Sequence, residues 1–141
     1  MTSLGPSRRP RNARAAEPVK FVPKGWGYEK WIANCEKYCG KLLFIAKDKQ
    51  CSWHYHKLKD EVFFVQSGKI KLYHSWDTDI EKADITILRR GDKFHVPIGL
   101  KHRMFALILN YLSSVQNIWI LILTESCLEI CFDFCIIMWI P

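Results

Sequence analysis

The sequence predicts an all-β domain, because short apolar or alternating runs recur about every 8–12 residues with turn signals between them. The runs that predict strands are residues 41–47, 61–66, 69–75, 83–88 and 94–97. Residues 69–75 and 83–88 alternate between two faces, as a half-buried strand does. Ser67-Gly68 and Arg90-Gly91-Asp92 separate neighbouring runs, and this rhythm is typical of a sandwich or barrel.

Length and composition allow one folded domain with a segment on either side. The chain has 141 residues, 49% of them hydrophobic, which is enough for one core. Residues 1–18 are rich in Pro, Ser, Arg and Ala and predict a flexible basic leader. Residues 19–106 predict the β-barrel domain, and residues 107–141 form an atypical hydrophobic tail.

The net charge of +7 does not by itself indicate a nucleic-acid partner. Four arginines cluster in the leader, whereas the other basic residues are scattered among acids as far as Arg103. We therefore expect no nucleic-acid binding.

The six cysteines and the N-terminal sequence indicate the cellular compartment of the protein. The leader has no apolar segment of the secretory type, so we expect reduced thiols and a cytoplasmic protein. The leader has no acidic residue before Glu17, which is also compatible with targeting to an organelle. Cys35 and Cys39 have a spacing that could hold a metal, but ordinary half-buried cysteines are the better interpretation.

Two histidines and a carboxylate within eight residues indicate a metal site. His54 and His56 would point to the same face of a strand, because side chains two apart share a face. Glu61 follows a polar tetrapeptide that is long enough to turn the chain back towards them. These donors suit Fe(II), Mn(II), Ni(II) or Zn(II). Two histidines in this spacing are also common on solvated surfaces, so the pair alone decides nothing.

The longer frame around the histidines resembles the two sequence motifs of the cupin superfamily. Residues 54–68 read HYHKLKDEVFFVQSG and residues 91–102 read GDKFHVPIGLKH, with residues 69–90 between them. The resemblance implies a cupin-type jelly-roll β-barrel, often dimeric. The metal-ligand positions that it implies are His54, His56, Glu61 and His102. The turn positions that it implies are Gly68, Gly91, Pro97 and Gly99. Ala106 stands where the motif usually has Asn.

The segment before the first motif is similar to cupins of the mannose-6-phosphate isomerase type. Residues 22–40 read VPKGWGYEKWIANCEKYCG. This resemblance implies a metal-dependent isomerase acting on a small sugar or sugar phosphate, in which Glu61 could be the base if it does not bind the metal. An Fe-dependent cupin oxygenase and a non-catalytic or degenerate metal- or sugar-binding cupin are the alternatives.

Five other side chains near the motifs invite a functional interpretation. Lys24, Lys30 and Lys41 could meet a phosphate, although exposed lysines are usually only solvated. His74 and His95 alternate with residues near the site, and for each a structural role is the better interpretation.

The tail does not have the pattern of the strands that should close a barrel. Its only charges are Glu125, Glu129 and Asp133. Residues 105–123 have the length of a membrane helix, but their Asn, Ser and Gln side chains argue against a membrane span. When Leu107 to Cys127 are back-translated and read one base earlier, permitted codons give a strand-like alternation. We hypothesise that the tail is frameshifted, which would leave the barrel without its closing strand at the C-terminus.

Overall fold

The computed structural model describes residues 17–107 and 118–124, and most of these residues lie in β-strands. The described strands are β1 (Lys20–Lys24), β2 (Gly27–Asn34), β3 (Cys39–Ile45), β4 (Glu61–Ser67), β5 (Lys69–Ser75), β6 (Asp84–Arg89), β7 (Lys93–Val96), β8 (Lys101–Leu107) and β9 (Ile118–Thr124). A single 3-10 turn, η1 (Ile80–Lys82), precedes β6. The predicted all-β class is therefore confirmed.

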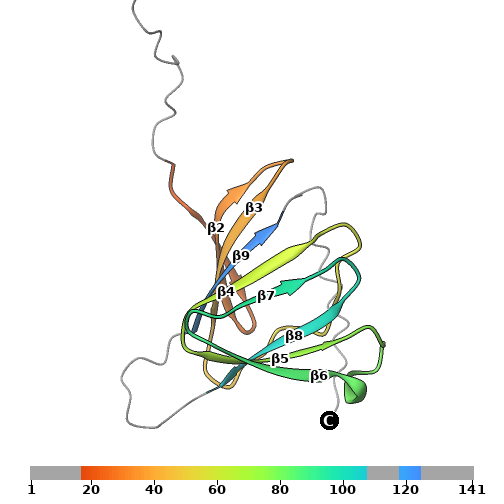
Figure 1. The fold of residues 1–141 in the computed structure, drawn as a ribbon. Helices are drawn as coiled ribbons and strands as arrows, with labels where there is room; N and C mark the ends of the chain where they lie inside the picture. Colours follow the sequence, from red (N-terminus) through yellow and green to blue (C-terminus); the bar gives the residue numbers. More distant parts are fainter. Residues whose placement is uncertain (1–16, 108–117, 125–141) are drawn as a thin grey trace, which may run out of the picture.

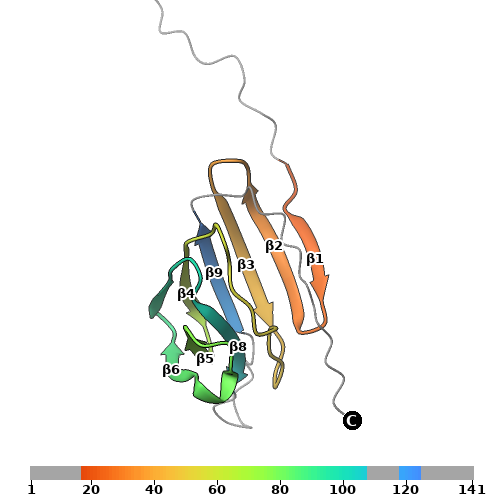
Figure 2. The ribbon, with the colours of Figure 1, turned by 90° about the vertical axis from the view of Figure 1, so that its right-hand side faces the viewer.

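The strands form two antiparallel sheets that pack face to face as a jelly roll (Figures 1 and 2). The large sheet has the order β1-β2-β3-β9-β4-β7, and the small sheet has the order β6-β5-β8. Among the described strands, no ladder of paired residues joins the two sheets, so the barrel is not closed.

The core lies between the sheets and follows the two-residue period of the strands. Phe63 and Val65 of β4 face it from the large sheet, and Ile70 and Leu72 of β5 face it from the small one. All four side chains are fully buried. The alternation that predicted residues 69–75 as a strand is the pattern that buries Ile70 and Leu72.

β9 corrects the expectation that the tail supplies no closing strand. It lies inside the hydrophobic tail, yet it pairs with β3 on one side and β4 on the other. Ile118, Ile120 and Ile122 point into the core. The residues between them are also apolar, so the strand's two faces look alike in the sequence.

The membrane helix over residues 105–123, which the sequence already argues against, does not form where the structure describes these residues. Residues 105–107 belong to β8 and residues 118–123 to β9, while residues 108–117 lie outside the described part of the chain. Within that described part, no helix has the length and apolar character needed to cross a bilayer.

Gly68, the last residue of the first motif, lies between β4 and β5 and close to Ile118 of β9. Its φ of 84° lies in the left-handed region, which side chains other than glycine rarely adopt. A Cβ at this position would come within 2.6 Å of Cγ1 of Ile118. The turn between β4 and β5 therefore needs glycine both for its backbone angle and for the close approach of β9.

The position of β9 predicts unequal costs for two truncations within it. Ile120→Ala, at a fully buried position, should lower the free energy of unfolding by ~2–5 kcal/mol because it leaves a cavity in the core. Leu123→Ala, where the side chain is 53% exposed, should cost less than ~1 kcal/mol. Urea titration of both variants measures the difference. Equal costs would contradict the burial of Ile120 and the exposure of Leu123.

Candidate metal centre

The two histidines of the first motif lie in an irregular segment rather than in a strand, which corrects the prediction. His54 forms a single isolated bridge to His102, and His56 has no strand pairing. The bridge consists of two backbone hydrogen bonds: His54 N–H donates to His102 O at 3.2 Å, and His102 N–H donates to His54 O at 2.8 Å. This reciprocal pair attaches the segment before β4 to β8.

His102 belongs to the inner face of β8. Its neighbours on that face are Met104 and Ala106, and all three side chains are buried. The imidazole of His102 is only 1% exposed. Ala106 stands where the motif usually has Asn, and it lies in the apolar core.

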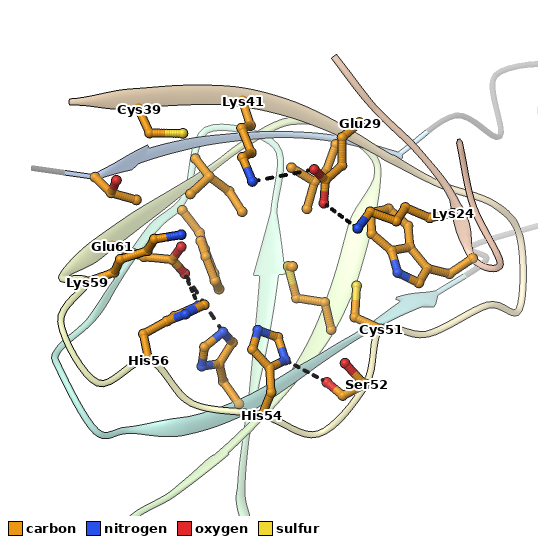
Figure 3. Close-up of a pocket in the computed structure, with 17 residues that line it drawn as sticks. Lys24, Glu29, Cys39, Lys41, Cys51, Ser52, His54, His56, Lys59 and Glu61 are labelled. Atoms are coloured by element: carbon orange, nitrogen blue, oxygen red, sulfur yellow. Dashed lines mark hydrogen bonds and ion pairs between the residues drawn. The ribbon is translucent and has the colours of Figure 1, made fainter. Parts of the chain in front are cut away.

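The imidazoles of His54, His56 and His102 converge in a cavity between the sheets (Figure 3). One ligand atom from each ring lies within 4.8 Å of the others. The ring centroids of His54 and His102 are 4.4 Å apart, and that of His56 lies 5.0 Å from His54 and 5.4 Å from His102. Three nitrogens at these separations can surround one cation.

Hydrogen bonds to the backbone orient two of these rings. Nδ1 of His54 donates to Ser52 O at 2.9 Å, and Nδ1 of His102 donates to Leu100 O at 3.0 Å. A carbonyl oxygen can only accept, so the proton of each neutral ring resides on Nδ1. The lone pair of Nε2 is then available for a metal, which is the arrangement usual for histidine ligands.

Gly99 of the second motif fixes the backbone beside His56. Its N–H donates to His56 O at 2.9 Å, and Leu100 N–H donates to Pro97 O at 3.1 Å to close the turn. Gly99 has a φ of 86°, so the turn requires glycine there. The two motifs are thus joined at His56 as well as at His54.

Glu61, the first residue of β4, lies beside the histidines. One of its carboxylate oxygens, Oε2, is 3.1 Å from Nε2 of His56 and 3.8 Å from Nε2 of His102. The donor set of three imidazoles and one carboxylate fits a divalent transition metal.

The pKa values of two of these groups lie below their usual values. Burial, together with the nearby charge of His54, lowers the pKa of His102 to about 3. Burial alone would raise the pKa of Glu61, but the hydrogen bond from His56 and the charges of the three histidines lower it below the usual value. At neutral pH, His102 is therefore neutral and Glu61 ionised, which are the protonation states that metal ligands need.

The remaining histidines lie outside the cluster. Nε2 of His74 is 2.8 Å from the Thr86 hydroxyl, although His74 shares the inner face with His102. His95 is exposed, and its Nε2 lies 2.6 Å from a carboxylate oxygen of Asp60. Neither side chain lines the cavity.

The cysteines of the described segments do not form a metal site. Cys35 is exposed while Cys39 and Cys51 are buried, and none of the three forms a disulfide within the described residues. Cys39 and Cys51 line the cavity, each on a different wall. Cys127, Cys131 and Cys135 lie outside the described residues.

The rest of the cavity wall contains residues that the sequence did not single out. Trp26, Glu29 and Lys59 line it, together with Thr124 at the end of β9. Glu29 could have been found from the two-residue period of β2, had that strand been assigned. Lys59 lies in an irregular segment, where no periodicity marks the inward side.

Comparison with known proteins identifies the fold and no closer relationship. No family profile and no curated protein sequence matches the chain. KdgF from Halomonas sp. is a structural neighbour at 15% identity and a TM-score of 0.59, with 76% of this chain and 88% of KdgF covered. The capsular polysaccharide assembling protein CapF from Staphylococcus aureus gives 14% identity and a TM-score of 0.65, covering 79% of this chain and 31% of CapF. Oxalate decarboxylase from Bacillus subtilis gives 16% identity and a TM-score of 0.63, covering 79% and 28%.

The chain has the cupin fold. The cupin predicted from the two motifs is thereby confirmed at the level of the fold. The chain spans about a third of the length of CapF and of oxalate decarboxylase. The oxalate decarboxylase of Bacillus subtilis is described as having Mn(II) centres.

The cluster predicts that the metal-free protein loses stability in acid. Unfolded His102 takes up a proton as the pH falls through 6.5, whereas the folded residue stays neutral until about pH 3. The lowered pKa of Glu61 acts in the same direction at lower pH. The free energy of unfolding should therefore fall by up to about 3 kcal/mol between pH 6.5 and 4, as measured by urea titration.

The group that causes the loss of stability in acid is identified by how steeply the free energy of unfolding changes with pH, because its value at one pH changes in any destabilised variant. His102→Gln should flatten the loss between pH 6.5 and 4, and His95→Gln, at an exposed position, should leave it unchanged. An unchanged slope in His102→Gln would contradict the assignment.

Proposed function

We propose that this cupin binds one divalent transition metal through His54, His56 and His102, with Glu61 as a fourth ligand or as the hydrogen-bond partner of His56. The observation that carries the proposal is the arrangement of the rings: their ligand atoms lie within 4.8 Å of one another, and carbonyl oxygens hold Nδ1 of His54 and His102.

We further propose that the metal site acts on a small sugar or sugar phosphate, in the manner of an isomerase. A bound divalent metal would polarise a substrate carbonyl. Glu61 is ionised at neutral pH, so its Oε2 can accept a proton if it is not itself a ligand. His56, 3.1 Å from that oxygen, would hold the carboxylate in position.

Two observations favour a carbohydrate over other small molecules. Residues 22–40 resemble isomerase cupins, and CapF, which shares the fold, is a capsular polysaccharide assembling protein. The cavity also offers polar side chains next to the histidines, including Ser52 and Thr124, which suit a ligand with several hydroxyl groups.

Metal content should depend on the histidine cluster. The purified protein, reloaded with Zn(II) or Mn(II), should contain about one metal per chain by elemental analysis. His54→Ala and His102→Ala should each lower the affinity for metal by at least about 100-fold, because each removes one of three nitrogen ligands. His95→Ala, outside the cluster, is the matched control and should retain the metal.

Turnover then distinguishes the candidate reactions. Metal-dependent conversion of an aldose into a ketose, abolished by a chelator and restored by reloading, is the expected result. Oxygen consumption by the Fe(II)-loaded protein would instead favour an oxygenase, for which the same donors are suitable. A parent protein that holds no metal after reloading would contradict the proposal as a whole.

A further inference from the structure

The cavity has a second polar wall, opposite the histidines, that the proposed metal site does not use (Figure 3). Glu29 of β2 lies on this wall between two lysines. Nζ of Lys24 is 3.7 Å from one carboxylate oxygen of Glu29, and Nζ of Lys41 is 3.5 Å from the other. The indole N–H of Trp31 donates to the same carboxylate at 2.7 Å. Glu29 is thus fixed, and it holds two ammonium groups at the edge of the cavity.

Three lysines of the cavity are withdrawn from solvent to an unusual degree. The side chains of Lys24 and Lys41 are 21% and 12% exposed, and Lys59 as a whole is 4% exposed. Lysine is among the residues least often buried, because removing an ammonium group from water is costly. Three such side chains around one small cavity suggest a role beyond stability.

The charges of the cavity favour an anionic ligand. Its charged lining residues other than histidine are three lysines and two glutamates, which leaves a net charge of +1. A divalent cation held by neutral histidines would raise this charge to +3. In a cavity largely withdrawn from water, an excess of this size attracts anions.

We propose that Lys24 and Lys41 bind the carboxylate or phosphate group of an anionic sugar while its carbonyl end faces the histidines. The proposal rests on the proposed function and narrows its substrate class to sugar acids and sugar phosphates. Lys41 projects from β3 beside Ile122 of β9, so the anion site is built on the strands that form the core. Charge-assisted hydrogen bonds from lysines are a common means of binding either anion.

Lys30 provides a matched control, because its place differs from the sequence expectation. Lys30 is one of the three lysines that could meet a phosphate on the sequence alone, but it follows Glu29 on β2 and so faces the opposite side of the sheet. Its Nζ lies 5.3 Å from the ring centroid of Trp119 and 6.0 Å from that of Tyr28. It does not line the cavity.

Calorimetry with two matched pairs of sugars tests the proposal on the metal-loaded full chain. The probes are galacturonate against galactose, and mannose 6-phosphate against mannose. At least one anion should bind about 10-fold or more tightly than its neutral counterpart, and which one does so distinguishes a carboxylate from a phosphate ligand. Lys24→Gln and Lys41→Gln should each weaken that anion about 10-fold and leave metal content unchanged. Lys30→Gln should change neither.

The outcomes separate the anion site from the metal site. Neutral sugars that bind as tightly as the anions, or no binding of any probe to metal-loaded protein, would overturn the anion proposal and leave the metal site intact. An equal loss in Lys30→Gln would also overturn it. If the parent chain holds no metal, the proposed function fails, and the same titrations on the metal-free protein still test the lysines. Circular dichroism of each variant establishes that it is folded.

Discussion

The reciprocal backbone hydrogen bonds between His54 and His102 are the contact on which the site depends. They continue a run of main-chain contacts in which Cys51 N–H donates to Met104 O and Ala106 N–H donates to Lys49 O, so the segment keeps an antiparallel register to β8 although it belongs to neither sheet. The bond from Gly99 to His56 O adds a further attachment. Two short motifs that are distant in the sequence therefore meet through main-chain contacts, and the imidazoles meet as a consequence.

The site occupies the polar end of an otherwise apolar interior. Along the inner face of the large sheet, Cys39, Thr124 and Glu61 are neighbours across β3, β9 and β4. Two positions along each strand, towards the core, the corresponding neighbours are Lys41, Ile122 and Phe63. Beyond them the buried residues of the core are apolar. The apolar surroundings lower the pKa of His102 and so keep it neutral, at a cost in stability at low pH.

The sequence predicted the all-β class and five of the nine described strands, and its two motifs indicated the histidines that meet in the cavity. The alternation in residues 69–75 gave β5 with its correct bounds, because one face is buried and the other is not. β9 could not be found in this way, since Trp119, Leu121 and Leu123 make its outer face as apolar as its inner one. The spacing of His54 and His56 indicated a strand, but both lie in an irregular segment, which the bridge between His54 and His102 joins to β8. Long-range contacts of this kind leave no local pattern.

The most direct test of this account is a long-range ¹H–¹⁵N correlation spectrum of the histidine side chains, recorded with and without Zn(II). The chain has five histidines, so His74 and His95 serve as internal references. The account predicts that His54 and His102 carry their proton on Nδ1 before zinc is added, and that zinc then shifts Nε2 of His54, His56 and His102 alone. A proton on Nε2 of His102, or a zinc-dependent shift confined to His74 or His95, would contradict it.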